Sequence, residues 1–215
     1  MKRRVVALLM ATMMGAFCIT GCGSSKEATS DKAAKTEKEA DTESDKDADK
    51  KAADKVAALI DAIYVQERND KTDEQCAEAK EAWDALTDAQ KELVEGENAD
   101  PDYFGRDTGD ASKDDARNQD DIGENEILAV SFGTSFNDSR VADIKGIEDA
   151  LQEANPDWSV RRAFTAQIII NHVQARDGEK IDNVDQALER AVDNGVKNLV
   201  VQPTPVSYTH LTLPT

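Results

Sequence analysis

The sequence predicts an α/β fold in which an incomplete parallel sheet of three strands, arranged βαβααβ, follows a small all-α helical module and disordered acidic linkers. Three observations predict it. Apolar runs at 126–131, 158–164 and 198–202 are separated by segments with helical spacing of apolar residues, which is typical of parallel strands joined by crossover helices. Apolar residues also recur at helical spacing over 56–94. The stretches between these segments are charged and poor in apolar residues, which favours disorder.

The N-terminus has the features of a secretory signal. Met1–Arg4 is basic, and the apolar run 5–19 is too short to span a membrane comfortably. The run ends in Gly21 and Cys22, which resemble the lipobox of bacterial lipoproteins, where the cysteine is acylated after cleavage. The resemblance implies a signal peptide over 1–22, lipidation of Cys22 and an extracytoplasmic protein anchored to the bacterial cell membrane. An ordinary cleaved signal that happens to end near a cysteine is the alternative.

Residues 23–55 are expected to form a disordered charged tether. They are mostly Lys, Asp, Glu, Ala, Ser and Thr without apolar periodicity, so burial cannot offset the entropy of ordering them. Over the whole chain, 44 acidic residues outnumber 26 basic ones and give a formal net charge of -18. This charge argues against nucleic acid as a partner. The isolated Cys76 is expected to be a small packed or half-exposed residue, not a reactive thiol.

Residues 56–95 are predicted to form a small helical module of three helices. Thr72 with Gln75, and Thr87 with Gln90, have the spacing of capping boxes at helix starts. The first helix has one apolar face, formed by Val56, Leu59, Ile60, Ile63 and Tyr64. A bundle of this size has enough apolar residues for a core of its own, to which Trp83 contributes.

The stretch 82–94 resembles helical repeats found in many surface proteins of Gram-positive bacteria. This resemblance implies a spacer or a weak binding module. From 96 to 125 the chain is acidic and rich in Gly, Asp and Asn, so we expect an acidic linker. Its carboxylates lack the spacing of a calcium loop, and we interpret them as a solvated loop.

The α/β region is predicted over 126–205. Asp138 or Ser139 is placed to cap the first helix, which carries apolar residues through Leu151, and two further helices are predicted at 166–176 and 184–193. Side chains alternate along a strand, so Arg161 and Arg162 must point to opposite faces, and at most one of them can face a ligand cleft. We expect the other to pair on the surface. Three strands also leave an apolar sheet edge open.

A polar loop follows the first strand of this region. Ser131, Gly133, Thr134 and Ser135 place hydroxyls and backbone N–H groups at a strand end and near a helix start, where anions such as carboxylates are favoured. An ordinary strand-to-helix turn, with Gly133 selected for its backbone freedom, is the alternative. Phe164, at the end of the second strand, is placed to line a ligand or to be part of the core.

Four phrases of this region resemble one family. They are Val130-Ser131-Phe132-Gly133-Thr134-Ser135, Arg161-Arg162-Ala163-Phe164-Thr165, Arg176-Asp177-Gly178 with Ile181-Asp182-Asn183, and Val200-Val201-Gln202-Pro203-Thr204. In this order they look like the N-terminal half of the anaerobic sirohydrochlorin cobaltochelatases, the class II chelatases of anaerobic cobalamin biosynthesis. The resemblance covers about eighty residues.

The resemblance implies insertion of Co(II), or another divalent metal, into the tetrapyrrole sirohydrochlorin, with cobalt as the substrate metal and no bound cofactor. It implies two similar α/β domains that face each other across the tetrapyrrole. The substrate-binding residues carried over to this chain are Ser131, Phe132, Gly133, Thr134, Ser135, Arg162, Phe164 and Thr165. In this family the metal ligands and the base are two histidines and a glutamate of the C-terminal domain, so no catalytic or metal residue is assigned here.

We interpret residues 126–205 as the truncated N-terminal part of such a domain and expect this chain alone to be inactive. Residues 206–215, which include His210, look like the translated end of a sequencing adaptor. His172, on a predicted helix, is interpreted as a solvated side chain and not as a ligand. The sequence does not indicate an oligomeric state.

Two other functions stay open. One is a surface-tethered lipoprotein that holds or carries a tetrapyrrole or metal without inserting it, because cobalamin assembly is cytosolic and a tethered chelatase is badly placed for it. A surface-adhesion module, suggested by the helical repeat, would have no affinity for tetrapyrroles.

Overall fold

The computed structural model describes residues 33–204, and their side chains from residue 45 onward. The chain divides into two units at Asp41 and Thr42, and all packing considered below lies within the unit that begins at Thr42. The predicted signal peptide 1–22 and the predicted adaptor segment 206–215 lie outside the described residues. Within residues 33–204, no helix combines the length and the apolar character needed to cross a lipid bilayer.

The helical module consists of helices α1 (Ala33–Ile63), α2 (Thr72–Asp84), α3 (Asp88–Lys91) and α4 (Pro101–Phe104). Its buried core includes Ile60, Ile63, Cys76, Trp83 and Phe104. Trp83 and Phe104 pack edge to face with ring centroids 5.0 Å apart. A helical module was predicted here, and the interpretation of Cys76 as a packed residue is confirmed, since it is fully buried.

Helix α1 begins earlier than predicted. It starts at Ala33, inside the stretch that we expected to be a disordered tether, so that expectation is wrong for residues 33–55. Charges of opposite sign four residues apart stabilise a solvated helix, and Lys50 pairs with Asp54 at 2.9 Å in this way. Ala53, near the end of the predicted tether, is fully buried in the module core, so this part of the helix is held by packing.

One of the two predicted capping boxes is present. Thr87 and Gln90 bond each other's backbone N–H groups at the start of α3. Helix α2 instead has Lys71 at its N-cap without a side-chain bond, and the Thr72 hydroxyl accepts from the N–H of Asn69. The Thr72 hydroxyl therefore bonds the turn before α2 and does not cap the helix.

The stretch predicted as an acidic linker is packed against the α/β region. Residues 105–124, which we call the strap, contain a short 3₁₀ helix, η1 (Ala111–Lys113). The carbonyl of Thr108 accepts from the N–H of Asp138 at 2.7 Å. The side chain of Asp114 is fully buried in ion pairs. The expectation of a solvated loop is therefore wrong at Asp114, because this carboxylate pairs with two buried arginines.

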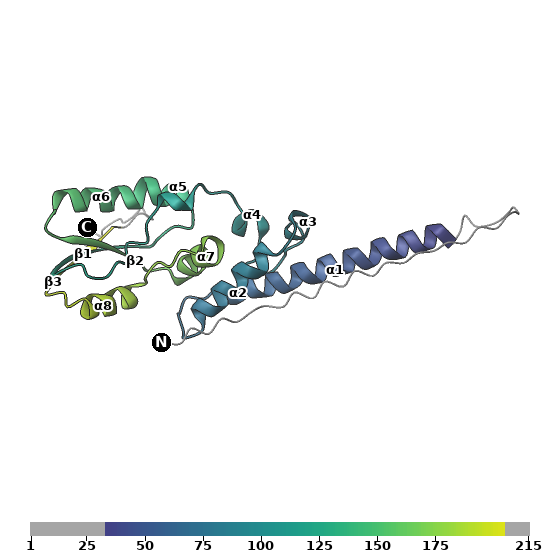
Figure 1. The fold of residues 1–215 in the computed structure, drawn as a ribbon, viewed down its shortest axis with the longest axis horizontal. Coiled ribbons are helices and arrows are strands. Elements are labelled where there is room, and N and C mark those ends of the chain that lie inside the picture. Colours follow the sequence, from purple (N-terminus) through teal and green to yellow (C-terminus); the bar gives the residue numbers. More distant parts are fainter. Residues whose placement is uncertain (1–32, 205–215) are drawn as a thin grey trace, which may run out of the picture. The chain divides into compact units, whose positions relative to one another are not determined.

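The sheet has three parallel strands, β1 (Asn125–Ser131), β2 (Ser159–Phe164) and β3 (Asn198–Pro203), in the order β2-β1-β3. Five helical segments connect them: α5 (Asn137–Ser139), η2 (Arg140–Ile144, a π-helix), α6 (Lys145–Ala154), α7 (Gln167–Asp177) and α8 (Val184–Asp193). Figure 1 shows α6 on one side of the sheet and α8 on the other. The predicted α/β fold with its incomplete parallel sheet is confirmed.

The two faces of the sheet bury alternate residues of β1. Ile127 and Ala129 pack with Leu151 of α6, whereas Leu128 packs with Ala187 of α8. Strand β3 is exposed along its whole length, and its apolar side chains Leu199, Val200 and Val201 are 37%, 46% and 50% exposed. The predicted open edge is therefore present at β3, while β1 is enclosed.

Helix α7 is covered by the helical module. Helix α2 packs along it, and Ala175 of α7 belongs to the module core. The side chain of Asn171 donates to the carbonyl of Ile63 at 2.8 Å, and that of Gln174 donates to Asp73 at 3.0 Å. The helical module and the α/β region therefore share buried side chains.

These contacts predict how residues 126–204 behave when expressed alone. Without the strap and the module, Asp114 is removed from its arginines and the buried face of α7 is exposed to water. We expect this segment to be loose or aggregation-prone and to lack a sharp unfolding transition, because part of its core is missing. Calorimetry or circular dichroism on residues 126–204 and on residues 45–204 makes the comparison. A sharp, cooperative melt of the shorter segment would contradict the expectation.

Candidate functional site

The polar loop lies at the carboxyl end of β1, where ligands bind in open α/β sheets. We call residues 131–136 the β1 loop. The N–H of Thr165 donates to the carbonyl of Ser131 at 2.9 Å, and the N–H of Ala166 donates to that of Phe132 at 3.3 Å. The ends of β1 and β2 are thereby joined. Thr165 therefore lies beside the β1 loop, so the two can belong to one binding site.

Gly133 gives the loop its close approach to β2. Its φ of +93° lies in the region that favours glycine. A Cβ at this position would clash with the ring of Phe164, which is fully buried. Phe164 is packed with Ile144, Ile170, Val173 and Ile181. It therefore serves as core beneath the loop, which was one of its two predicted roles.

The loop exposes two aromatic side chains, Phe132 and Phe136, whereas Ser131 and Ser135 are buried. Phe132 is 48% exposed, so its ring is available to a ligand. The hydroxyl of Ser131 is buried and has no hydrogen-bond partner within the described residues. The Thr134 hydroxyl accepts from the N–H of Phe136 at 3.2 Å, and the Ser135 hydroxyl lies 3.2 Å from that of Tyr103.

Arg161 and Arg162 point to opposite faces of the sheet, as the strand pattern predicted. Arg161 donates to Glu126 at 2.9 Å and to the carbonyl of Ala187 on the α8 side. Arg162 forms two bonds of 2.8 Å to Glu148 on the α6 side. Both arginines are fully buried, so the expectation of a surface pair is wrong. The structure does not bring Arg162 to the exposed part of the loop.

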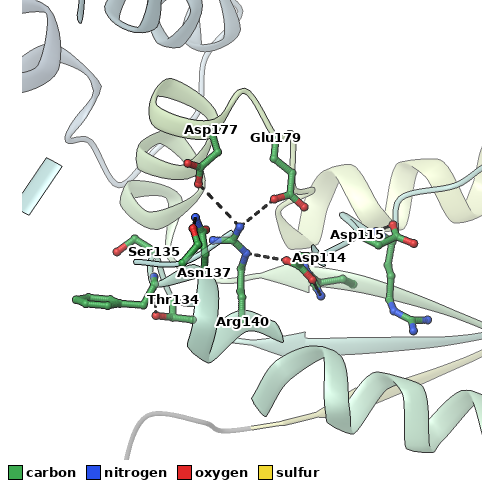
Figure 2. A network of polar contacts seen from close by, with 12 residues as sticks. Asp114, Asp115, Thr134, Ser135, Asn137, Arg140, Asp177 and Glu179 are labelled. Atoms are coloured by element: carbon green, nitrogen blue, oxygen red, sulfur yellow. Dashed lines mark hydrogen bonds and ion pairs between the residues drawn. The ribbon is translucent and has the colours of Figure 1, made fainter. Parts of the chain in front are cut away.

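A buried network of ion pairs lies behind the loop. The carboxylate of Asp114 accepts from Arg162 at 2.8 and 2.9 Å and from Arg140 at 2.7 Å. Figure 2 shows Arg140 approached by Asp114 of the strap and by Asp177 and Glu179 at the end of α7. Arg140 donates to Glu179 at 2.9 Å and lies 3.9 Å from Asp177. Arg140 opens η2, directly after α5, and its N–H donates to the carbonyl of Phe136 at 2.9 Å, so these bonds also fix the loop's end.

The network shifts the pKa of its carboxyl groups in opposite directions. Burial alone would raise the pKa of Asp114, but the bonds and charges of Arg162 and Arg140 outweigh it and hold this pKa at about 2. Burial raises the pKa of Glu179, and the charge of Arg140 opposes that rise. Asp114 is therefore the fixed anion of the network. Sequence analysis missed it. The only signal was that two adjacent strand arginines need buried carboxylates, and the strap contains many.

His172 is buried, not solvated as expected. Helix α7 is covered by the module, and the imidazole lies against the rings of Tyr103 and Phe104, with centroids at 4.8 and 5.0 Å. Its Nδ1 lies 2.8 Å from the hydroxyl of Tyr64. Burial, supported by the charge of Arg176, lowers the pKa of His172 to about 4, so the ring is neutral near pH 7.

A polar pocket of about 460 Å³ lies at the carboxyl end of β2. It is lined by Gln66, Glu67, Arg68, Phe164, Thr165, Gln167, Asn183, Val184 and Asp185. Residues 66–68 come from the helical module, and the others surround the starts of α7 and α8. Thr165 is exposed in this pocket, next to the β1 loop.

The described residues offer no metal centre. Within residues 33–204, no group of three or more His, Cys, Asp or Glu side chains is arranged to hold a metal ion. Cys76 is a free, buried thiol, and burial raises its pKa to about 11. A thiolate nucleophile at this position is therefore disfavoured at neutral pH.

Comparison with known proteins assigns this region. Residues 125–209 match the cobalt chelatase family, CbiK. They are a cobaltochelatase-like region. The sirohydrochlorin cobaltochelatase of Salmonella typhimurium is 38% identical to this chain over 76 residues, which are 35% of the chain. The chain spans 29% of the length of that relative. No solved structure shows significant similarity to the chain.

The close packing of Gly133 predicts the effect of Gly133→Ala. The added methyl group meets the Phe164 ring at a positive φ, so we expect a loss of about 1–3 kcal/mol in the free energy of unfolding. Urea unfolding measures it. Gly146→Ala is the matched control, because Gly146 lies within α6 with open space around its Cβ position, and a gain of about 0.5–1 kcal/mol is expected. Equal stabilities of the wild type and Gly133→Ala would contradict the role of Gly133.

The ion network predicts that Asp114→Asn is strongly destabilising. It leaves two buried guanidinium groups short of a negative charge, which costs about 3–5 kcal/mol. The control is Asp115→Asn, since Asp115 is exposed and only accepts from the N–H of Arg117, which asparagine can also do. Both variants are compared by chemical denaturation at pH 7. A loss at Asp114 no greater than that at Asp115 would show that the network is dispensable.

The buried state of His172 predicts a pH dependence. The pKa is about 4 in the folded state and near 6.5 when unfolded, so the unfolded chain binds the extra proton between these values. This contribution to stability is complete above pH 6.5 and is lost as the pH falls toward 4, by about 3 kcal/mol. Denaturation at a series of pH values measures the slope, which His172→Gln should flatten in this window. An identical slope in both proteins would exclude His172 as the cause.

Proposed function

We propose that this chain is part of a sirohydrochlorin cobaltochelatase-like protein and binds a tetrapyrrole along one wall of a cleft. The observation that carries the proposal is the match of residues 125–209 to the cobalt chelatase family, combined with a loop at the carboxyl end of the central strand β1. The partial match to a sirohydrochlorin cobaltochelatase supports sirohydrochlorin as the ligand. Co(II) is then the second substrate.

The proposed binding surface uses the β1 loop and the end of β2. Sirohydrochlorin is a polycarboxylate, and the hydroxyl groups of Thr134 and Thr165, which are not buried, suit its carboxylates. Ser135 is buried and acts by holding the loop in place. The half-exposed ring of Phe132 suits the face of the macrocycle. Gly133 and Ser131 set the loop's path, and Arg162 supports it from below through Asp114. These roles are proposals about the predicted site residues.

We propose that the chain by itself binds the tetrapyrrole without inserting cobalt. Insertion needs ligands for the metal and a base for the pyrrole protons, and residues 33–204 do not gather three such groups. The resemblance implies that two histidines and a glutamate of a second domain do this work in the family. The whole protein's chelatase activity is therefore proposed for a longer protein that includes such a domain.

The N-terminal sequence favours a second candidate function. We propose that Cys22 is lipidated and anchors the protein outside the cytoplasm, at the cell membrane. At that location the protein would hold or carry a tetrapyrrole or metal without chelatase activity. The sequence of Gly21 and Cys22 after a short apolar run is the observation that favours it.

A titration of the full chain with sirohydrochlorin tests the binding, with visible absorbance as the readout. We expect a saturable spectral change on binding. When Co(II) is added, we expect no cobalt-sirohydrochlorin to form. Thr134→Val, which keeps the shape of the side chain without its hydroxyl, is expected to weaken binding about 2- to 10-fold. The absence of any saturable change would sink the tetrapyrrole proposal and favour an adhesion module. Formation of cobalt-sirohydrochlorin by the chain alone would overturn the proposal that it only binds.

A further inference from the structure

Four residues connect the helical module to the β1 loop in a closed circuit of contacts. The hydroxyl of Tyr103 in α4 lies 3.2 Å from that of Ser135 in the loop. The carbonyl of Ser135 accepts from Arg176 at 2.6 Å, and Arg176 in turn lies 3.3 Å from Nε2 of His172. The rings of His172 and Tyr103 pack edge to face at 4.8 Å, which closes the circuit.

The protonation of His172 follows from its partners. A guanidinium group only donates hydrogen bonds, so Nε2 of His172 accepts from Arg176. The proton then lies on Nδ1, which donates to the hydroxyl of Tyr64 at 2.8 Å. Tyr64 follows the end of α1, so the module orients the imidazole through Tyr64 and through the rings of α4. The imidazole in turn orients Arg176.

The β1 loop depends on these outside contacts. Its internal side-chain bond is the one from the N–H of Phe136 to Thr134, at 3.2 Å. Arg176 holds the carbonyl of Ser135 and also bonds the side chain of Asn137 at 3.1 Å. All the groups that hold Ser135 therefore come from α4 and α7, and α7 is itself covered by the module.

We propose that the helical module is a fixed part of the tetrapyrrole site and that Tyr103 is a positioning residue for the β1 loop. Residues 45–104 lie outside the region that matches the chelatase family. The module is then neither a spacer nor an independent binding unit. What the loop binds rests on the proposed function, whereas the positioning does not.

Amide hydrogen exchange of the full chain tests the positioning without a ligand. In Tyr103→Phe the ring that packs on His172 is kept and the hydroxyl on Ser135 is lost. We expect exchange at residues 133–136 to become about 2- to 10-fold faster, with little change in α2 and α7. Ser135→Ala should have a similar effect, and the double variant should be no faster than either single variant, because one contact is removed in all three.

The control is Gln90→Ala. Gln90 caps α3 and donates to Asp49 within the module, and neither contact reaches α7 or the β1 loop. This variant should speed exchange in α3 and leave residues 133–136 unchanged. Unchanged loop exchange in Tyr103→Phe, or equal acceleration of the loop in Gln90→Ala, would overturn the proposal.

Sirohydrochlorin titration of the same variants separates this inference from the proposed function. Tyr103→Phe is expected to bind about 2- to 10-fold more weakly than Gln90→Ala. Faster loop exchange in Tyr103→Phe together with weaker binding supports both proposals. Faster loop exchange while no variant binds supports the positioning and refutes tetrapyrrole binding. Equal affinities of the wild type and Tyr103→Phe would refute the role of the module in the site.

Discussion

The rest of the structure depends on the buried carboxylate of Asp114. It accepts from two guanidinium groups, Arg140 and Arg162, whose side chains are fully buried. Removing an arginine from water costs several kcal/mol, and only close carboxylates with good hydrogen-bond geometry offset this. Glu148 partners Arg162 from α6, but Arg140 relies on the strap and on the segment after α7. The α/β region therefore needs a residue from outside its own strands and helices.

This dependence changes how the segments around the chelatase-like region are understood. The strap and the helical module fall outside the matched residues 125–209, yet both contribute buried groups. The strap neutralises the arginines behind the loop, and the module covers α7 and encloses His172. Both constraints converge on the β1 loop, since Arg140 lies just after it and Arg176 bonds Ser135. The loop's shape is thus set by three separate segments of sequence.

Patterns within short stretches of sequence predicted the strands, the helices and the face to which each strand residue points. Alternating and helical spacing located all three strands and the helices between them, and placed Arg161 and Arg162 on opposite faces. The position of Asp114 was not predictable in this way, because its bond to Arg162 joins residues 48 apart through the tertiary fold. The burial of His172 was missed for the same reason: it depends on the packing of α2 and α4 on α7. The prediction from composition also failed for the first part of α1, because a solvated helix with charge pairs has the same composition as a disordered tether.

The open strand β3 bears on whether the loop can function in this chain. An edge strand with exposed apolar side chains tends to pair with other chains, so Leu199, Val200 and Val201 are a source of association. The β1 loop lies on the other flank of β1, where it is bonded to Thr165 and Ala166 after β2. The N–H of Thr204 donates to the carbonyl of Val130 at 2.8 Å and keeps β3 paired up to the end of β1. The groups that shape the loop therefore come from the residues after β2, from the strap, and from α4 and α7, and an unpaired outer edge at β3 leaves them in place.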